Sequence, residues 1–404
     1  MVKKIEDYIP IVGQSAVDDV RLIAEKLKGK VIQNVNSTKS GGGVAEILNN
    51  MIPLLQGLGV DARWDVIQGE EHFFSVTKKF HNVLHGRPDE VTQRDFDIFM
   101  ETSEKNVRAT DITGDIVFVH DPQPIALINK KQNNKWIWRC HIDVSHPYQR
   151  VWNFLMDFIV RYDSAVFSAP GFSFKLPIRQ FLISPSIDPL SDKNKELSSD
   201  EIDAVMYKYG ISRKKPIITQ ISRFDRLKDP LGVIEVYQLV KKYVDCQLIL
   251  AGGGASDDPE GMEVFAEVKE KAKKDPDIHI LLLPQDDITI NALQRASTII
   301  VQKSLKEGFG LTVAEALWKK KPVVASHVGG IPLQITHKHS GMLCYSIQGA
   351  AYSVKQLLNS PAYAKRLGEN GHEHIKNNFL ITRHIKDYIL LFLSLFYKGD
   401  IVYL

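Results

Sequence analysis

The stretch KEGFGLTVAEALWKKKPV, residues 306–323, carries two carboxylates, Glu307 and Glu315, with a glycine-rich turn between them. Gly308 and Gly310 permit left-handed backbone conformations and let a ligand approach the main chain closely. Taken alone, Glu307 is equally well explained as an ordinary loop carboxylate, and Glu315 as a side chain that complements a helix dipole. The segment therefore indicates a possible ligand site without identifying the ligand.

A helix is predicted to begin directly after this turn. Thr312 suits its N-cap, Glu315 its first turn, and the lysines at 319–321 its end, which we expect to be solvated. The start of a helix offers unpaired N–H groups and a partial positive charge, and both attract anions, phosphates above all. The helix start is therefore predicted to bind an anionic ligand.

Two cations follow an apolar strand in SRFDRLKDP, residues 222–230. Arg223 and Lys228 stand close together after the segment IITQI. The donor fork of an arginine and the point charge of a lysine can together neutralise a diphosphate. A surface pair at the start of a helix explains the same two residues, and the segment alone does not separate the two interpretations.

Histidine and aspartate side chains stand at the ends of two other predicted strands. WRCHIDVSHP contains His141 and Asp143, and VHDPQP contains His120. A histidine at such a strand end can form a hydrogen bond with a neutral hydroxyl. A metal site built on Cys140, His141 and His146 is the less favoured alternative, because no second cluster completes four ligands. We expect no metal.

Glycine-rich turns follow two predicted strands, SGGG at 40–43 and LAGGG at 250–254. Either turn lets the backbone approach a ligand or simply makes a tight connection between a strand and a helix. Neither has the full spacing of a dinucleotide-binding turn, so each is a weak signal by itself.

Composition and charge narrow the class of protein. The 404 residues suggest two to three domains, and 44% hydrophobic with 25% charged residues is ordinary for a globular protein. A net charge of +3 gives no basis for nucleic-acid binding. The three cysteines are scattered, which favours reduced thiols in a cytoplasm over a disulfide or zinc framework. The apolar segment 388–397 has about half the length of a membrane span, so we expect a packed terminal helix and no membrane partner.

Strand-like and helix-like segments alternate along the chain, which predicts an α/β fold with parallel, doubly wound sheets. The polar segment 188–203 is a candidate linker between two Rossmann-like halves that face a cleft. We expect an N-terminal domain over 1–188 with the helix of 382–404, and a C-terminal domain over 189–381. The predicted strands lie within 30–37, 115–122, 136–145, 165–172, 181–188, 216–225, 246–254, 278–284, 298–304 and 322–330.

Together these motifs resemble the retaining nucleotide-sugar glycosyltransferases of the GT-B fold. That class has a glutamate, seven intervening residues and a second glutamate, matched here by Glu307 and Glu315. The resemblance runs from SGGG to VGGIP at 328–332. Within the class, HDPQP, WRCHID, NALQRAS and the stretch that begins EGFGLTVAEA are most similar to trehalose synthases of the glycosyltransferring type. They are also similar to retaining trehalose phosphorylases.

The resemblance implies roles for individual residues. Arg223 and Lys228 would hold the diphosphate of an NDP-glucose, Glu307 would accept hydrogen bonds from the donor sugar, and Glu315 would accept them from the ribose. His141 would contact the donor sugar, and Asp143 and His120 the acceptor. Backbone around the glycine turns would line the donor, at Gly42, Gly43, Gly308, Phe309, Gly310, Leu311 and Thr312.

The implied reaction joins glucose to glucose from NDP-glucose, giving α,α-trehalose and NDP without a cofactor. Retention usually involves a carboxylate nucleophile. None is evident in the first half, and the resemblance implies front-face substitution, in which the leaving phosphate takes the acceptor's proton. The alternatives are a phosphorylase that uses glucose 1-phosphate, a sucrose synthase, and a non-catalytic protein that binds sugar nucleotides. A homodimer is compatible with the resemblance.

Overall fold

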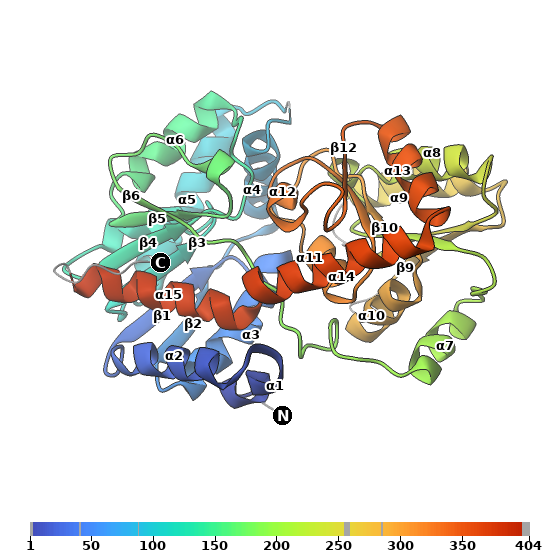
Figure 1. Ribbon diagram of the computed structural model, residues 1–404. Helices are drawn as coiled ribbons and strands as arrows, with labels where there is room; N and C mark the ends of the chain where they lie inside the picture. Colours follow the sequence, from blue (N-terminus) through green and yellow to red (C-terminus); the bar gives the residue numbers. More distant parts are fainter. Residues whose placement is uncertain (1–2, 40–41, 88, 254–258, 284–285, 398–404) are drawn as a thin grey trace. The chain divides into compact units, whose positions relative to one another are not determined.

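The computed structural model describes residues 3–39, 42–87, 89–253, 259–283 and 286–397. The chain divides into two compact units, each an α/β unit with its own sheet (Figure 1). Unit 1 comprises Met1–Ser186 and Ile381–Leu404, and unit 2 comprises Ile187–Leu380.

Unit 1 contains a six-stranded parallel sheet in the order β2-β1-β3-β4-β5-β6. Every residue of β3 is buried, as expected where helices cover both faces of a parallel sheet. The strands are β1 (Val31–Asn36), β2 (Asp61–Val66), β3 (Ile116–His120), β4 (Lys135–Arg139), β5 (Ser164–Phe167) and β6 (Arg179–Leu182).

The helices of unit 1 include one from the far end of the chain. The expected terminal helix exists as α15, and it contacts α2 and α3 although they are far away in sequence (Figure 1). Phe118 of β3 packs edge-on against Tyr388 and Phe392 of α15, with ring centroids 5.1 and 5.6 Å away. The helices are α1 (Ile9–Val12), α2 (Gln14–Glu25), α3 (Gly42–Gly57), α4 (Glu71–Leu84), α5 (Gln93–Ala109), α6 (Gln149–Ile159) and α15 (Ile381–Phe396).

Unit 2 contains a second six-stranded parallel sheet, in the order β12-β11-β10-β7-β8-β9. Its strands are β7 (Ile217–Ile221), β8 (Gln247–Gly252), β9 (Ile278–Leu282), β10 (Ile299–Gln302), β11 (Val323–Ser326) and β12 (Met342–Cys344). Its helices are α7 (Ser199–Lys208), α8 (Pro230–Lys241), α9 (Pro259–Ala272), α10 (Asp287–Ala296), α11 (Leu311–Trp318), α12 (Ile331–Gln334), α13 (Ile347–Leu358) and α14 (Pro361–Asn378).

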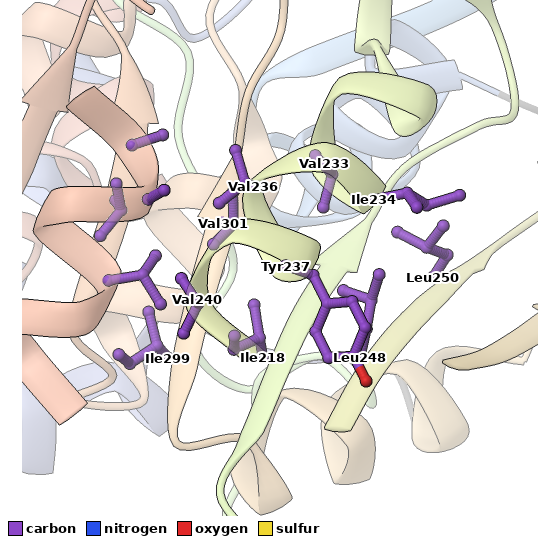
Figure 2. Close-up of a cluster of buried hydrophobic side chains, with 14 of the residues drawn as sticks. Ile218, Val233, Ile234, Val236, Tyr237, Val240, Leu248, Leu250, Ile299 and Val301 are labelled. Atoms are coloured by element: carbon purple, nitrogen blue, oxygen red, sulfur yellow. The ribbon is translucent and has the colours of Figure 1, made fainter. Parts of the chain in front are cut away.

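One core cluster of unit 2 lies between α8 and the sheet (Figure 2). Val233, Val236 and Val240 of α8 are buried in one cluster with Ile218 of β7 and Leu248 of β8. The helix begins at Asp229, whose carboxylate accepts a hydrogen bond from Gly232 N at 3.0 Å, with proline in the first turn. This packing fixes α8, and with it the loop that precedes the helix, against the ends of the strands.

The parallel, doubly wound α/β class predicted from the sequence is confirmed in both units. The prediction missed β2 and β12. The candidate linker at 188–203 contains turns in its first part and a helix start at its end. Its last residues begin α7, where Ser198 and Glu201 form a capping box. Asn194 within it is buried and donates to Asp188 O at 3.0 Å.

Candidate active site

In unit 2 the order of strands reverses between β7 and β10. From β7 the chain proceeds through β8 to β9 at one edge, and from β10 it proceeds through β11 to β12 at the other. Ligands of open α/β sheets bind beyond the carboxyl ends of the strands at such a reversal. The loops that follow these two strands contain the predicted residues Arg223, Lys228 and Glu307.

Lys228 and Glu307 meet directly, although they were predicted from separate motifs. Lys228 Nζ donates to Glu307 Oε2 at 2.7 Å, and the two side chains are only 18% and 10% exposed. Ser304 Oγ donates to the same carboxylate oxygen at 3.2 Å. Within the described ranges no protein group donates to Glu307 Oε1, so this oxygen keeps its capacity to accept a hydrogen bond.

Further contacts join the two loops behind this ion pair. Leu305 N donates to Leu227 O at 2.7 Å. The buried Lys303 donates through Nζ to Asp229 Oδ2 at 2.8 Å. Each loop thus contributes one cation and one carboxylate, in the pairs Lys228–Glu307 and Lys303–Asp229. These contacts keep Lys228 close to Glu307 before any ligand binds.

A glycine of the VGGIP segment supports the Glu307 loop from its other side. Gly329 has a φ of +55°, and a Cβ at that position would lie 1.6 Å from Glu307 O. The next residue, Gly330, donates through its N–H to Gly308 O at 3.1 Å. The close approach of the two segments requires a residue without a side chain at 329.

Arg223 is more open to solvent than Lys228. Its side chain is 59% exposed, and Nη2 lies 3.1 Å from Asp225 Oδ2. The end of β8 supports this turn, because a Cβ on Gly252 would lie 1.8 Å from Ser222 O. The first glycine of LAGGG is therefore needed for the approach of β8 to the Arg223 turn, whereas residue 254 lies outside the described residues.

The start of α11 differs from the sequence prediction. The N-cap is Gly310 at a φ of +86°, with no side-chain cap, so the expected cap by Thr312 is wrong. Leu311 and Thr312 form the first turn, and Val313 N donates to Gly310 O at 2.9 Å. A glycine can take this left-handed conformation, and its lack of a side chain leaves the helix start uncovered by a cap.

Phe309 anchors the same turn in the protein interior. Its ring is 5% exposed and lies 5.4 Å from the ring of Phe379, measured between centroids. Gln334 Nε2 donates to Phe309 O at 2.5 Å. The ring of Phe309 is therefore buried, and the predicted contact with the donor could be made only by its main-chain atoms.

Glu315 lies deeper than its predicted place in the first turn. It is the fifth residue of α11 and 1% exposed, with Gln294 Nε2 at 3.5 Å from Oε2 and Lys193 Nζ at 3.9 Å from Oε1. The solvated lysine run was also wrong in part, because Lys319 is buried. Its Nζ donates to Asn194 Oδ1 at 2.8 Å, and burial lowers the pKa of Lys319 to about 7.

In unit 1 the corresponding reversal lies between β1 and β3, and it brings His120 and His141 together. His120 Nδ1 and His141 Nε2 are 3.2 Å apart. His120 Nε2 lies 3.1 Å from Oδ1 of Asn34, a residue of β1. Both ring nitrogens of His120 thus have protein partners, and its predicted contact with the acceptor stays a prediction.

The buried Arg139, at the end of β4, sets the electrostatics of this cluster. Burial, together with the charge of Arg139, lowers the pKa of His120 to about 3. The pKa of His141 also lies well below its ordinary value, because partial burial removes hydration from the ring and because Arg139 is charged. Both imidazoles are therefore neutral at physiological pH.

The other predicted residues of unit 1 are Asp143, which is close to His141 in the sequence, and Gly42 and Gly43, which begin α3. Asp143 is 3% exposed, and its Oδ1 accepts from Ser145 N at 3.0 Å and from Ser145 Oγ at 2.6 Å. Gly42 and Gly43 open α3, while residues 40–41 of the same turn lie outside the described residues. Donor and acceptor roles for these residues stay predictions.

Comparison with known proteins identifies the family. Residues 34–174 match the family described as trehalose synthase, N-terminal domain, and residues 201–374 match glycosyl transferases group 1. The trehalose synthase of Thermococcus litoralis is 43% identical over 96% of both chains, and that of Rubrobacter xylanophilus is 42% identical over 97% of both. The chain belongs to the trehalose synthase family. It is thus a glycosyltransferase of trehalose metabolism, as the motifs predicted.

More distant relatives of this trehalose synthase family member include a trehalose phosphorylase and solved structures with a similar fold. The trehalose phosphorylase of Grifola frondosa is 32% identical over 88% of this chain and 56% of its own. A sucrose-phosphate synthase from Thermosynechococcus elongatus has a TM-score of 0.74 at 16% identity, covering 92% of this chain and 100% of its own. Similarity to that structure and to the trehalose-6-phosphate synthase OtsA, at a TM-score of 0.71, confirms the GT-B fold.

Several residues that hold the family's motifs in place were not predicted from the sequence. Ser304 and Lys303 bond to the carboxylates of unit 2, and Asn34 bonds to His120 of unit 1. Arg139 adds to the effect of burial in lowering the pKa of His120 and His141. A usable signal existed for Arg139 alone, since a charged residue in the apolar run WIWRC needs a reason to be buried.

The described ranges contain neither a cluster of metal ligands nor a membrane-spanning helix. They contain no group of three or more histidine, cysteine, aspartate or glutamate side chains that could hold a metal ion. In the same ranges no helix is long and apolar enough to cross a membrane.

Proposed function

We propose that this member of the trehalose synthase family transfers glucose from an NDP-glucose to free glucose, forming α,α-trehalose and NDP with retention of configuration. The bond from the anomeric carbon to the phosphate oxygen breaks, and a bond to the acceptor hydroxyl oxygen forms. The proton of that hydroxyl passes to the leaving phosphate. The observation that carries the proposal is the partly buried Lys228–Glu307 pair at the strand reversal of unit 2.

Each partner of the pair suits one half of the donor. Lys228, with Arg223 nearby in sequence, would neutralise charge on the diphosphate as the glycosidic bond breaks. The uncapped N–H groups at Leu311 and Thr312 would bind phosphate oxygens. Glu307 holds Lys228 and Ser304 on one oxygen, so its Oε1 would accept from a hydroxyl of the transferred glucose.

The remaining assignments rest on position and on the family. Glu315 would accept from the ribose hydroxyls, because its carboxylate has long contacts with Gln294 and Lys193, at 3.5 and 3.9 Å, and no shorter one within the described ranges. His141 would contact the donor sugar, and Asp143 the acceptor. Two complexes of a protein with this fold, Anabaena HepE, contain UDP with glucose and UDP-glucose, which supports a nucleotide-sugar donor.

The test is a matrix of donors and acceptors with the products identified by NMR. NDP-glucose with free glucose is expected to give a nonreducing glucose disaccharide and NDP, in EDTA as well as in magnesium, because protein cations supply the positive charge. Absence of that disaccharide would sink the proposal. The phosphorylase relatives make glucose 1-phosphate the informative second donor, since its exclusive use would assign phosphorolysis instead.

A further inference from the structure

The amide of Asn34 has only one orientation that satisfies both of its neighbours. Its Nδ2 donates to Arg63 O, a main-chain carbonyl of β2, at 3.2 Å, and its Oδ1 faces His120 Nε2 at 3.1 Å. A flipped amide would place oxygen against the carbonyl oxygen of Arg63. Because a carbonyl oxygen only accepts, Asn34 must present its NH₂ group to Arg63 and its oxygen to His120.

This orientation decides which nitrogen of His120 bears the proton. Asn34 Oδ1 is an acceptor, so His120 Nε2 must donate. His120 is 1% exposed and lies beside the cationic Arg139, so it carries one ring proton and no charge. Its Nδ1 is therefore a bare lone pair, and the group 3.2 Å away, His141 Nε2, must donate to it.

The same reasoning carries over to His141. A neutral imidazole that donates through Nε2 has no proton on Nδ1, so Nδ1 is an acceptor. The main-chain N–H of His141 donates to Asp121 Oδ1 at 2.8 Å, which holds the residue in place at the end of β4. The side chain is not fully buried, and among the described residues no protein group is bonded to its Nδ1.

We propose that Asn34 and His120 are positioning residues that hold His141 in a single tautomer, with Nδ1 presented as an acceptor for a hydroxyl of the transferred sugar. This inference rests on the proposed function, because it assigns the hydroxyl to the donor glucose. It goes beyond that function by assigning a direction to every hydrogen bond from β1 to the sugar. His120 then acts through His141 and does not bind the acceptor itself.

The direction matters for the choice of ligand group. A hydroxyl that donates to Nδ1 keeps its own oxygen lone pairs free for other donors, whereas a cationic or reversed imidazole would compete for them. The second histidine is needed because a lone imidazole exchanges between its two tautomers. The buried His120 offers His141 a fixed acceptor, Nδ1, and so selects one tautomer of His141 without adding a charge.

The first test reads the tautomer without reference to activity. Long-range proton–nitrogen NMR spectra of the full chain, labelled with ¹⁵N-histidine, show which ring nitrogen of each histidine bears hydrogen. His141 and His120 are each expected to be protonated on Nε2 alone near neutral pH, with signals assigned through His141→Ala and the variants below. A proton on Nδ1 of His141 would overturn the proposal.

A matched pair of substitutions separates direction from packing. In His120→Asn the side-chain oxygen takes the place of Nδ1 and can still accept from His141 Nε2, whereas in His120→Leu a side chain of the same shape cannot. The asparagine variant is expected to keep the His141 tautomer and a kcat within about threefold of the parent. The leucine variant is expected to lose the single tautomer and roughly tenfold in kcat. Equal tautomers and equal kcat in both variants would contradict the relay.

A third variant should reverse the chain of hydrogen bonds. In Asn34→Asp a carboxylate favours a doubly protonated His120, which would donate through Nδ1 and force His141 to carry its proton on Nδ1 instead. A purely structural Asn34 predicts no such reversal. If glucose 1-phosphate proves to be the donor, the proposed function fails, but the same variants assayed with that donor still test the relay, because it acts on the sugar.

Discussion

At the scale of single residues, Lys228 binds Glu307 and is proposed to bind the diphosphate of the donor as well. In the described structure it neutralises the nearly buried Glu307, whose side chain is 10% exposed, and in the proposed reaction it also faces the diphosphate. The ion pair holds the two side chains beside each other. The cation is thus present before the donor arrives, which is the condition for stabilising charge that develops in a transition state.

Substitution of this lysine should lower the reaction rate and, because Glu307 loses its cation, also the stability of unit 2. Lys228→Ala is expected to lower kcat by a factor of about 100 or more, because one donor to the developing phosphate charge is removed. Steady-state assays with NDP-glucose and glucose measure the loss, with the exposed Lys242→Ala of the same unit as the control. A rate equal to that of the control would remove Lys228 from the mechanism.

Lys319 gives a second prediction at this scale, through its titration. Its pKa is about 7 in the folded chain, below the ordinary 10.5, because the ammonium is buried. Between these values the unfolded chain binds more protons than the folded one, so this group makes the free energy of unfolding rise with pH. Below pH 7 both states are charged, and the burial cost is present in full.

The neighbouring lysine supplies the control for that titration. Lys319→Met is expected to reduce the rise in unfolding free energy between pH 7 and pH 10.5, by at most about 1.4 kcal/mol per pH unit. Lys320→Met, at an exposed position, should leave the rise unchanged. Urea titrations at several pH values measure it, and identical profiles for both variants would contradict the buried charge.

At the scale of elements, the sequence was informative wherever an apolar run ended in glycine, proline or a polar turn. It failed at β2, whose sequence DARWDV alternates charged with apolar residues because the strand lies at the sheet edge. It also failed at β12, which has only three residues. The cap of α11 was misassigned because Gly310, and not Thr312, takes the N-cap position in a left-handed conformation. Asn34 was missed because its partner His120 is remote from it in the sequence.

One glycine turn makes an element-scale prediction. Gly252→Ala is expected to move the Ser222–Arg223 turn, because its Cβ would lie 1.8 Å from Ser222 O. We expect a stability loss of about 1–3 kcal/mol, typical of overpacking, together with lower kcat/KM. At the adjacent Gly253 the nearest atom to a Cβ is Leu283 O at 3.7 Å, so Gly253→Ala should be close to neutral. Thermal unfolding and donor kinetics distinguish the two variants, and equal effects would contradict this reading.

At the scale of the whole molecule, unit 2 is inserted into unit 1. The ends of the insertion lie side by side, since Ile187 N donates to Phe379 O at 2.9 Å and Ile187 forms a parallel bridge with Leu380. A continuous segment with adjacent ends and its own core has what it needs to fold alone. Unit 1 differs, because it is incomplete until α15 returns to it from the end of the chain.

Truncation after Leu380 should therefore lower the stability of unit 1 and leave that of unit 2 unchanged. Unit 1 would lose Ile385, Tyr388, Ile389 and Phe392, all at most 1% exposed, and with them the aromatic contacts to Phe118. We expect the truncated chain to lose glucosyl transfer and the cooperative unfolding of unit 1, while unit 2 still binds NDP. Limited proteolysis should then leave a fragment near 187–380, and that segment expressed alone should show the same melting transition. A truncated chain with full activity and the unfolding profile of the intact protein would contradict the role of α15, because unit 1 would then have a complete core without it.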